Sequence, residues 1–367
     1  MMGDENLIAA LERGDRTSQI YISDIDCPEL QKLIAVMDKP YSILRTFSLM
    51  ASIFDSEPVL PKTFLGGSAP SLRSLSLKDV QFPTFPEFIL SSNHIVSLSL
   101  CRVGYFSPEV MAGCLAVLPK LSSFLLESKY PLSHTFQKTP PPLTRAALPA
   151  LDHFSFDGSS QYFEALVSHI DTPILKRLFI TLSIPALKIP RLHGFVDCIE
   201  SLGPFHRAVM DVSYGKIEIL LGPPTRFKLA FLSQVEDWSV SSMTQVFSQQ
   251  LRLLSHVKTL RIQGALWQVT GPAIDSSLLL ELFRLFISVR SLCVSANRMA
   301  TVTTALKELT VEGAMEVFPA LCTLYLEGFQ SSGSVKELID PFVTSRQLSG
   351  HPVVIKSWEQ HRSGNKS

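Results

Sequence analysis

The chain has 367 residues, of which 46% are hydrophobic and 18% are charged, and its 33 Lys and Arg residues balance its 33 Asp and Glu residues. The apolar content excludes a mostly disordered chain, and the zero formal charge argues against a general binder of nucleic acid or of anionic membranes. A chain of this length would form roughly two or three ordinary domains unless it is an array of repeats.

A short apolar pattern recurs along the chain and predicts a series of short strands. In Φ-x-x-Φ-x-Φ, with Φ a large apolar residue, the last two Φ side chains point to the same face of a strand. Clear copies begin at Leu44, Leu72, Ile95, Leu121, Leu151, Leu175, Val257, Val289 and Leu321, and a degenerate copy begins at Thr17. Outside the gap between residues 175 and 257, successive copies begin 23 to 32 residues apart.

Proline stands at a fixed distance before several copies. Five copies carry it two residues before the first Φ, as Pro70, Pro119, Pro149, Pro173 and Pro319. Proline ends a helix and is tolerated at the start of a strand, where its missing N–H costs least. Its position therefore favours a helix that ends shortly before each strand.

The segments between these strands predict helices. Pro28–Met37 has Leu30, Leu33, Ile34 and Met37 at the spacing of one helix face. Ser107 and Pro108 suit the cap and the first turn of a helix that runs to Val117. We expect further helices over Tyr162–Ile170, Leu192–Leu202, Met243–Leu254, Leu278–Ile287, Val302–Phe318 and Val335–Phe342.

Strands and helices that alternate at this period are typical of leucine-rich repeats. We predict an α/β fold, a single irregular leucine-rich-repeat-like solenoid over residues 1–350, with a curved parallel sheet on the concave face and helices on the convex face. Residues 351–367 are expected to form a terminal strand and a polar tail. Stacking of the strands would bury Leu75, Leu98, Phe124, Phe154 and Leu178 in one core. The asparagine usual after such strands is absent, because Lys-Asp-Val follows Leu77 and Cys-Arg-Val follows Leu100.

Two stretches interrupt the array. Residues 131–149, with the run Pro140-Pro141-Pro142, predict an inserted loop. Residues 181–256 are the least regular section, because the gap after Leu175 leaves room for three more units. Strands could begin at Phe205 and Phe227, and Ile217–Leu221 also has the pattern of a strand, so the register there stays open.

Several motifs resemble those of the F-box/leucine-rich-repeat-like proteins of mushroom-forming fungi, over at least Glu5 to Phe329. They are Leu65-Gly66-Gly67-Ser68-Ala69-Pro70, Ser107-Pro108-Glu109, Pro141-Pro142-Leu143-Thr144, Leu148-Pro149-Ala150-Leu151 and Ile170-Asp171-Thr172-Pro173. The resemblance implies an F-box that docks on the adaptor of a cullin-based ubiquitin ligase and repeats that select the substrate. The residues before Glu5 are too few for an F-box, so the chain resembles the repeat region only. A cullin adaptor is expected as a partner only if an F-box is supplied elsewhere.

Residues that carry chemistry are scattered. The six cysteines include no Cys-x-x-Cys pair, which predicts reduced, mostly buried thiols in an intracellular protein. The nine histidines form no His-Glu-x-x-His motif, and no phosphate-binding glycine loop, dinucleotide-binding motif or Gly-x-Ser-x-Gly is present. Gly66-Gly67-Ser68 is interpreted as a turn into the next repeat, and Asp24 and Asp26 as solvated loop acids. We predict no catalytic residue, cofactor or metal site.

Neither a secretory signal nor a membrane-spanning segment is evident in the sequence. A cytoplasmic or nuclear monomer that binds neither membranes nor nucleic acid is therefore expected. We predict a non-catalytic module that binds a protein or peptide on the concave face, through strand residues that alternate with the buried ones. The candidate partner-binding residues are Lys78, Glu127, Asp157, Arg177, Phe179, Arg261 and Tyr325.

Two alternatives stay open. In the first, the chain is an enzyme with its site in the irregular 181–256 section, where Asp197, Glu200, His206 and Asp211 would have to converge in one deep pocket. In the second, it is a repeat remnant that has retained no partner.

Overall fold

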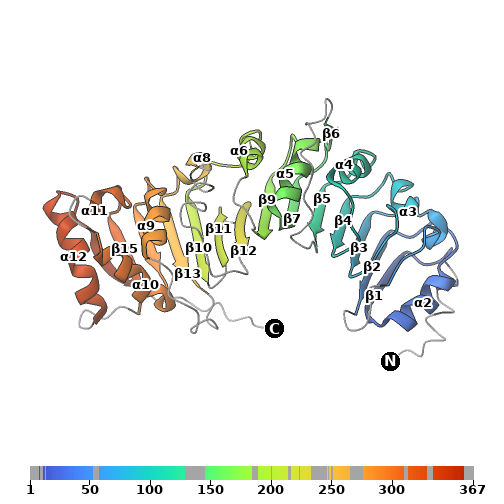
Figure 1. Cartoon of the computed structure of the whole chain (residues 1–367), viewed down its shortest axis with the longest axis horizontal. Helices are drawn as coiled ribbons and strands as arrows, with labels where there is room; N and C mark the ends of the chain where they lie inside the picture. Colours follow the sequence, from blue (N-terminus) through green and yellow to red (C-terminus); the bar gives the residue numbers. More distant parts are fainter. Residues whose placement is uncertain are drawn as a thin grey trace. The chain divides into compact units, whose positions relative to one another are not determined.

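The computed structural model describes residues 8, 11–12, 14–52, 58–128, 145–183, 189–199, 201–213, 216–222, 224–232, 246, 248, 251–264, 276–309, 313–328 and 334–358 (Figure 1). The chain divides into two compact units. Unit 1 comprises Met1–Leu182 and Ile189–Ser201, and unit 2 comprises Ser183–Lys188 and Leu202–Ser367. The single array over residues 1–350 stays a prediction.

The strands of unit 1 form a sheet from the predicted repeat cores. Each copy of the apolar pattern from Thr17 to Leu175 leads into one strand, as the sequence predicts. The strands are β1 (Gln19–Ile25), β2 (Thr46–Ala51), β3 (Ser74–Lys78), β4 (Ser97–Cys101), β5 (Ser123–Glu127), β7 (His153–Ser159) and β9 (Arg177–Ser183). Neighbours from β1 to β7 pair in parallel, and the short strands β6 (Ala146–Ala147) and β8 (Ile170–Asp171) pair separately. Most of the expected loop over 131–149 lies outside the described residues, and its end forms β6.

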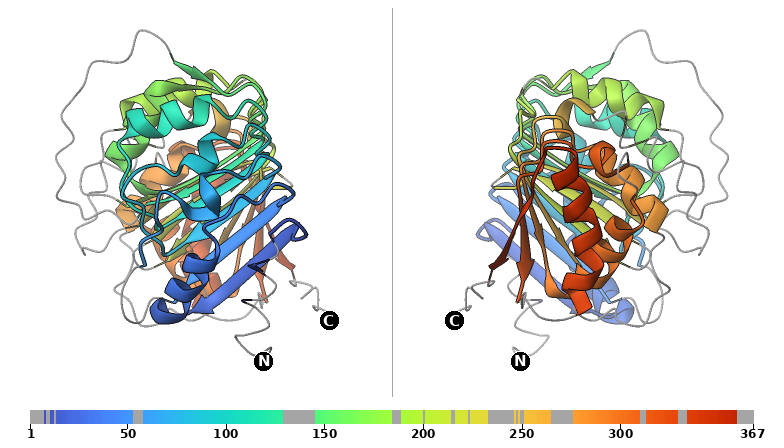
Figure 2. Two further views of the ribbon diagram at one scale, coloured as in Figure 1. Left: turned by 90° about the vertical axis from the view of Figure 1, so that its right-hand side faces the viewer. Right: turned by 90° about the vertical axis from the view of Figure 1, so that its left-hand side faces the viewer.

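Helices cover one face of the unit 1 sheet (Figure 2). They are α2 (Cys27–Val36), the 3-10 helix η1 (Phe64–Gly67), α3 (Glu87–Leu90), α4 (Pro108–Ala116), α5 (Ser160–His169) and α6 (Pro190–Asp197). Ser107 caps α4 as expected, because its hydroxyl accepts a hydrogen bond from the Val110 N–H at 3.3 Å. Asp26 is exposed in the connection between β1 and α2, as predicted, and it also caps α2, since its carboxylate accepts from the Glu29 N–H at 2.8 Å. Asp24 lies within β1 with φ of 55°, and so it does not belong to a loop.

One apolar core lies between this sheet and its helices. Leu75, Leu98, Phe124, Phe154 and Leu178 are each at most 1% exposed, which confirms the predicted register. The register places the first four side by side, and the Phe124 and Phe154 rings stack at 5.6 Å. The expected turn at Gly66-Gly67 is confirmed, with φ of 61° and 67° in η1.

Unit 2 departs from the prediction where the sequence is least regular. Its strands are β10 (Arg207–Ser213), β11 (Lys216–Leu221), β12 (Phe227–Leu232), β13 (Thr259–Gln263), β14 (Ser291–Val294), β15 (Thr323–Glu327) and β16 (Val354–Trp358). From β10 through β13 to β16 the strands run parallel, whereas β11 is antiparallel to both β10 and β12. The expected parallel units are wrong here, because only residues 214–215 separate β10 from β11 and a parallel crossover needs a dozen or more residues.

The helices of unit 2 lie over one face of its sheet (Figure 2). They are α8 (Leu251–Leu254), α9 (Ser276–Arg284), α10 (Ala296–Lys307), α11 (Gly313–Glu316) and α12 (Ser334–Leu348). The single helix expected over Val302–Phe318 is wrong, because α10 ends at Lys307 and α11 begins at Gly313. Among the described helices, none has the length and apolarity to cross a bilayer.

The cysteines differ from the prediction in their burial. All six thiols are free, but only Cys114 is buried, and Cys198 and Cys322 are exposed. The latter two lie at a helix end and directly before a strand, where the core does not cover them. Burial raises the pKa of Cys114 to about 11.

Candidate functional site

In each unit the helices cover one face of the sheet and leave the opposite face open. Along the regular strands, fully buried residues alternate with half-exposed ones, which gives each sheet a covered face and an open face. All seven candidate residues lie on strands at half-exposed or exposed positions. In unit 1 they are Lys78, Glu127, Asp157, Arg177 and Phe179, and in unit 2 they are Arg261 and Tyr325.

Hydroxyl groups dominate the open face of unit 1. The register aligns its side chains into rows that cross the strands, and the small residues gather in the first two rows. These rows are Thr46, Ser74, Ser97, Ser123 and His153, and then Ser48, Ser76, Ser99, Leu125 and Ser155. Short hydroxyl side chains leave the backbone accessible and carry no charge, so these rows offer hydrogen bonds rather than electrostatic attraction.

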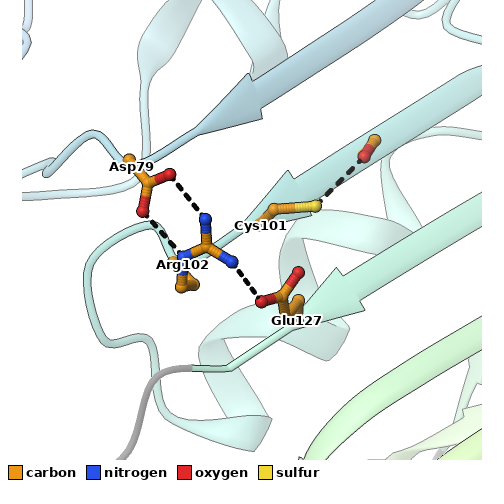
Figure 3. Close-up of polar contacts among 5 residues, drawn as sticks. Asp79, Cys101, Arg102 and Glu127 are labelled. Atoms are coloured by element: carbon orange, nitrogen blue, oxygen red, sulfur yellow. Dashed lines mark hydrogen bonds and ion pairs between the residues drawn. The ribbon is translucent and has the colours of Figure 1, made fainter. Parts of the chain in front are cut away.

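The third row leads to a charge network at the ends of the strands. Lys78, Cys101, Glu127 and Asp157 are neighbours in this row. Arg102, directly after β4, donates to both carboxylate oxygens of Asp79 at 2.6 and 2.7 Å and to Glu127 at 2.5 Å (Figure 3). Glu127, a candidate for partner binding, is therefore already engaged through one oxygen.

Burial explains why these charges pair so closely. The side chain of Asp79 is 2% exposed and that of Arg102 is 21% exposed. A buried carboxylate is costly unless it is paired. The hydrogen bond to Asp79, followed by that to Glu127, raises the pKa of Arg102 against the opposing effect of burial. Next to the network, burial raises the pKa of the Cys101 thiol.

A small pocket of about 220 Å³ lies beside the network. It is lined by Val103, Gly104, Phe106, Met111, Leu126, Glu127, Ser128 and Tyr162. The buried hydroxyl of Ser128 has no hydrogen-bond partner among the described residues. The space inside it that a water-sized sphere can occupy is only about 10 Å³, which is room for about one water molecule, so this pocket favours solvent over a substrate.

The candidate pair on β9 packs against β7 and the turn before it. The Phe179 ring meets the His153 ring edge-on at 5.1 Å, and Arg177 lies 4.0 Å from the Asp152 carboxylate. Burial, and then the charge of Arg177, lowers the pKa of His153. Half of Arg177 remains exposed, with a side-chain exposure of 49%, and so its guanidinium can still contact a partner.

Aromatic and cationic side chains meet on the open face of unit 2. The register aligns Val209, Arg261, Cys293, Tyr325 and Lys356 in one row. The Arg261 guanidinium carbon lies 4.8 Å from the centre of the Trp358 ring, and Lys356 Nζ lies 6.0 Å from that of Tyr325. Such cation–π contacts hold large, flat side chains at the surface, and arginine and aromatic residues dominate binding hot spots.

Four contributors to these surfaces were not predicted from the sequence. Asp79 and Arg102 lie one residue before the usual asparagine position of their repeats, which Val80 and Val103 occupy, and no local pattern marks them as an ion pair. Lys356 and Trp358 belong to the expected terminal strand. The alternation of β16 could have placed both on the open face. No local pattern links Trp358 to Arg261, because the two residues are 97 positions apart in the sequence.

The described residues of the enzyme alternative belong to different units and have local partners, with Asp197 in unit 1 and His206 and Asp211 in unit 2. Asp197 pairs with His193 at 3.0 Å one helical turn away, and Asp211 accepts from the Ser213 hydroxyl at 2.6 Å. His206 lies 3.3 Å from the carbonyl of His256, and Glu200 is outside the described residues. Within the described ranges, no group of three or more His, Cys, Asp or Glu residues could hold a metal ion.

Comparisons with known proteins give a distant likeness in fold. No protein-family model and no curated protein matches the chain. The chain is similar to the solved structure of a TLR13–ssRNA13 complex, with 14% identity, 78% of this chain and 32% of that chain covered, and a TM-score of 0.34. It is also similar to the leucine-rich repeat-containing protein LegL7 from Legionella pneumophila, with 16% identity, 77% and 92% covered, and a TM-score of 0.25.

This chain spans about a third of the length of the TLR13 chain that it matches. At TM-scores of 0.34 and 0.25, the fold assignment rests on the chain's own strands and helices. The chain has an α/β leucine-rich-repeat-like fold, in which strand, turn and helix recur and the strands form a mostly parallel sheet in each unit.

Proposed function

We propose that this chain is a non-catalytic interaction module whose open sheet faces bind a protein or peptide. One observation carries the proposal. The open face of unit 2 holds Arg261, Tyr325, Lys356 and Trp358 in two cation–π contacts at the surface. Arginine and aromatic side chains are the types most enriched at binding hot spots, so their contacts on this face support a partner there.

The open face of unit 1 contributes a second surface, which is rich in hydroxyl groups, to the proposal. Its hydroxyl rows, with Lys78 and Asp157 at one end and Arg177 and Phe179 on β9, suit contact with a polypeptide backbone and with mixed side chains. The seven candidate residues from the sequence thus remain the proposed contacts, and Trp358 and Lys356 join them.

A finer proposal concerns the ubiquitin system. The motifs that resemble fungal F-box/leucine-rich-repeat-like proteins support a role in substrate recognition, with the F-box supplied by another segment or chain. In this proposal the open faces would select the protein to be modified, and a cullin adaptor would be captured only when an F-box is present.

Affinity capture from the native cell tests the proposed function. The tagged chain should retain protein partners that the double variant Arg261→Ala/Tyr325→Ala loses, because truncation of central arginine and aromatic contacts removes most binding energy. Lys336→Glu is the matched control, since Lys336 is exposed on α12 in the same unit but on the helical side.

Two results would contradict the proposal. Partners that stay bound to the double variant but are lost with Lys336→Glu would assign binding to the helices. Turnover of a captured small molecule by the purified chain would reject the non-catalytic assignment. Recovery of a cullin adaptor with this chain alone would show that an F-box need not be supplied elsewhere.

A further inference from the structure

Exposed cations line the edge of the unit 2 sheet at which its parallel strands begin. Lys258 and Arg290 occupy the same position in neighbouring repeats, because the Arg290 N–H donates to the Lys258 carbonyl at 2.8 Å. Arg207 begins β10 and pairs in register with Thr259, the residue after Lys258. We call Arg207, Lys258 and Arg290 the cationic edge. Adjacent strands lie about 4.8 Å apart, so these residues follow one another in a strip along this edge, with Arg207 one residue further into its strand than Lys258 and Arg290.

No described residue neutralises this strip. All three side chains are exposed, and none forms an ion pair or a side-chain hydrogen bond with any described residue. On the adjoining open face, Arg261 contacts the Trp358 ring and Lys356 contacts the Tyr325 ring, and neither has a carboxylate partner in the described part of the chain. Five cations are therefore available to a ligand.

The carboxylates on the same sheet already have partners. Glu218 is 8% exposed and lies between Lys216 and Lys228. Asp211 accepts from the Ser213 hydroxyl at 2.6 Å, and Glu327 accepts from the Ala296 N–H at 2.9 Å. Neutral donors leave the negative charge of Asp211 and Glu327 in place, but the five cations of this surface outnumber these two carboxylates, so its net charge is positive even though the whole chain has a formal charge of zero.

The open face of unit 1 offers no such excess. Its rows consist mainly of serine, and its Arg102 already forms ion pairs with Asp79 and Glu127. Arg45 and Arg73 do occupy the position of Lys258 and Arg290 in their own repeats, since the Arg73 N–H donates to the Arg45 carbonyl at 2.8 Å. No cation–π pair accompanies them among the residues that the structure describes, so they provide a matched comparison within the same chain.

We infer that unit 2 binds an acidic, extended protein segment across strands β10, β13, β14, β15 and β16. The inference rests on the proposed function and specifies its ligand. Arginine and lysine along the edge attract carboxylates, and Tyr325 and Trp358 provide flat apolar surface for the side chains between them. The four strand spacings span about 20 Å, which an extended segment of about six residues covers.

An acidic polypeptide fits this surface better than a nucleic acid. The cations are confined to a short strip, and a neutral chain lacks the long-range field that favours binding along a polyphosphate. Carboxylates on alternate residues of an extended segment would meet the strip from one side.

Fluorescence anisotropy with defined probes tests the inference on the full chain. The probes are a labelled peptide of alternating glutamate and serine, the same peptide with glutamine, and a labelled single-stranded DNA oligonucleotide. The glutamate peptide should bind, and the double variant Lys258→Glu/Arg290→Glu should weaken its binding by about tenfold or more, because like charges then face each other. Arg45→Glu/Arg73→Glu makes the same change in net charge and should weaken it by less than about twofold.

Several outcomes would overturn the inference. The first is that the glutamine peptide binds as tightly as the glutamate peptide. The second is that the two glutamate double variants weaken binding of the glutamate peptide equally. The third is that the oligonucleotide binds more tightly than the glutamate peptide and that Lys258→Glu/Arg290→Glu abolishes its binding. The milder variant Lys258→Gln/Arg290→Gln, with melting measured alongside, shows that a loss reflects charge rather than unfolding.

The same variants separate this inference from the proposed function. If partners captured from cells depend on Arg261 and Tyr325 but not on Lys258 and Arg290, and the glutamate peptide fails to bind, the acidic ligand is wrong and the interaction module stands. If the glutamate peptide binds as described but no cellular partner depends on the open face, the proposed function fails while the cationic edge stands.

Discussion

At the scale of single residues, unit 1 places an ion pair one residue before the position at which leucine-rich repeats usually carry asparagine. Asp79 and Arg102 follow β3 and β4 directly and have φ of 58° and 51°. Aspartate tolerates this left-handed backbone, whereas it is uncommon for arginine. The bidentate pair with Asp79 and the bond to Glu127 hold Arg102 there, so neighbouring repeats are joined by side chains as well as by the sheet.

Replacement of Arg102 should reveal what this network contributes to stability. Arg102→Met leaves Asp79 buried without its guanidinium partner and should lower the free energy of unfolding by about 2–4 kcal/mol. Chemical denaturation measures this change. The exposed Arg73→Met should stay within about 0.5 kcal/mol of the wild type, and an equal loss in both variants would contradict the role of the pair.

His153 should make stability depend on pH in a defined direction. Its pKa in the folded chain is lowered from 6.5, chiefly by burial, and its buried Nε2 has no hydrogen-bond partner among the described residues. The unfolded chain therefore takes up the proton at higher pH than the folded chain does. The stabilisation is complete above pH 6.5 and is lost as the pH falls through the lowered value.

Denaturation at several pH values tests this linkage. Between pH 7 and 5 the wild type should lose more stability than His153→Gln, because glutamine does not titrate. Parallel curves for the two proteins would show that His153 is not the source of the loss.

At the scale of elements, side chains from one repeat begin the helices of another. The Glu164 carboxylate on α5 accepts from the N–H groups of Arg191 and Leu192 at the start of α6, and burial raises its pKa. Glu327 at the end of β15 accepts from the Ala296 N–H at the start of α10. The first N–H groups of a helix lack partners within it, and so each carboxylate sets where its helix begins.

Two glycines within the repeats of unit 1 should respond oppositely to alanine. A Cβ on Gly66 would lie 2.4 Å from the Pro40 nitrogen, and its φ is 61°, so Gly66→Ala should cost about 1–3 kcal/mol. Gly113 lies inside α4, and a Cβ there would meet nothing within 4 Å, so Gly113→Ala should add about 0.5–1 kcal/mol. Melting temperatures that shift in the same direction would refute this contrast.

At the scale of the whole molecule, stability comes from rows of apolar side chains that run across the strands. In unit 1 the row through Phe47, Leu75, Leu98, Phe124 and Phe154 is at most 1% exposed. In unit 2 the corresponding row through Ala208, Leu260, Leu292 and Leu324 is at most 3% exposed. A repeat therefore shares its buried side chains with both neighbours, and damage to one strand spreads to the next.

Substitutions at two adjacent residues of β4 should show that one face of the strand is buried and the other is open. Leu98→Asp buries an unpaired charge in the row and should cost more than about 4 kcal/mol, enough to prevent folding of unit 1. Ser99→Asp points to the open face and should cost less than about 1 kcal/mol. Circular dichroism melts measure both, and equal stability of the two variants would mean that the faces are assigned wrongly.

The local features of the repeats could be predicted from the sequence. Apolar alternation located all the strands with a clear pattern copy, and serine and proline at fixed places located the start of α4. The half-exposed positions of the seven candidate residues follow from the same alternation. The strand directions of the middle section were harder to predict from the sequence. The strands β10, β11 and β12 have similar apolar content, and only the two-residue connection after Ser213 decides the antiparallel pairing.

By itself, then, the sequence determined the strand and helix pattern, the face of each strand that is buried, and the side chains that reach the open face, because these depend on periods of a few residues. Only the tertiary structure decided the reversed strand β11, the Asp79–Arg102–Glu127 network and the contact between Arg261 and Trp358. Each of these joins residues from different strands, and their pairing depends on the register and on which charges become buried together, neither of which a local pattern records.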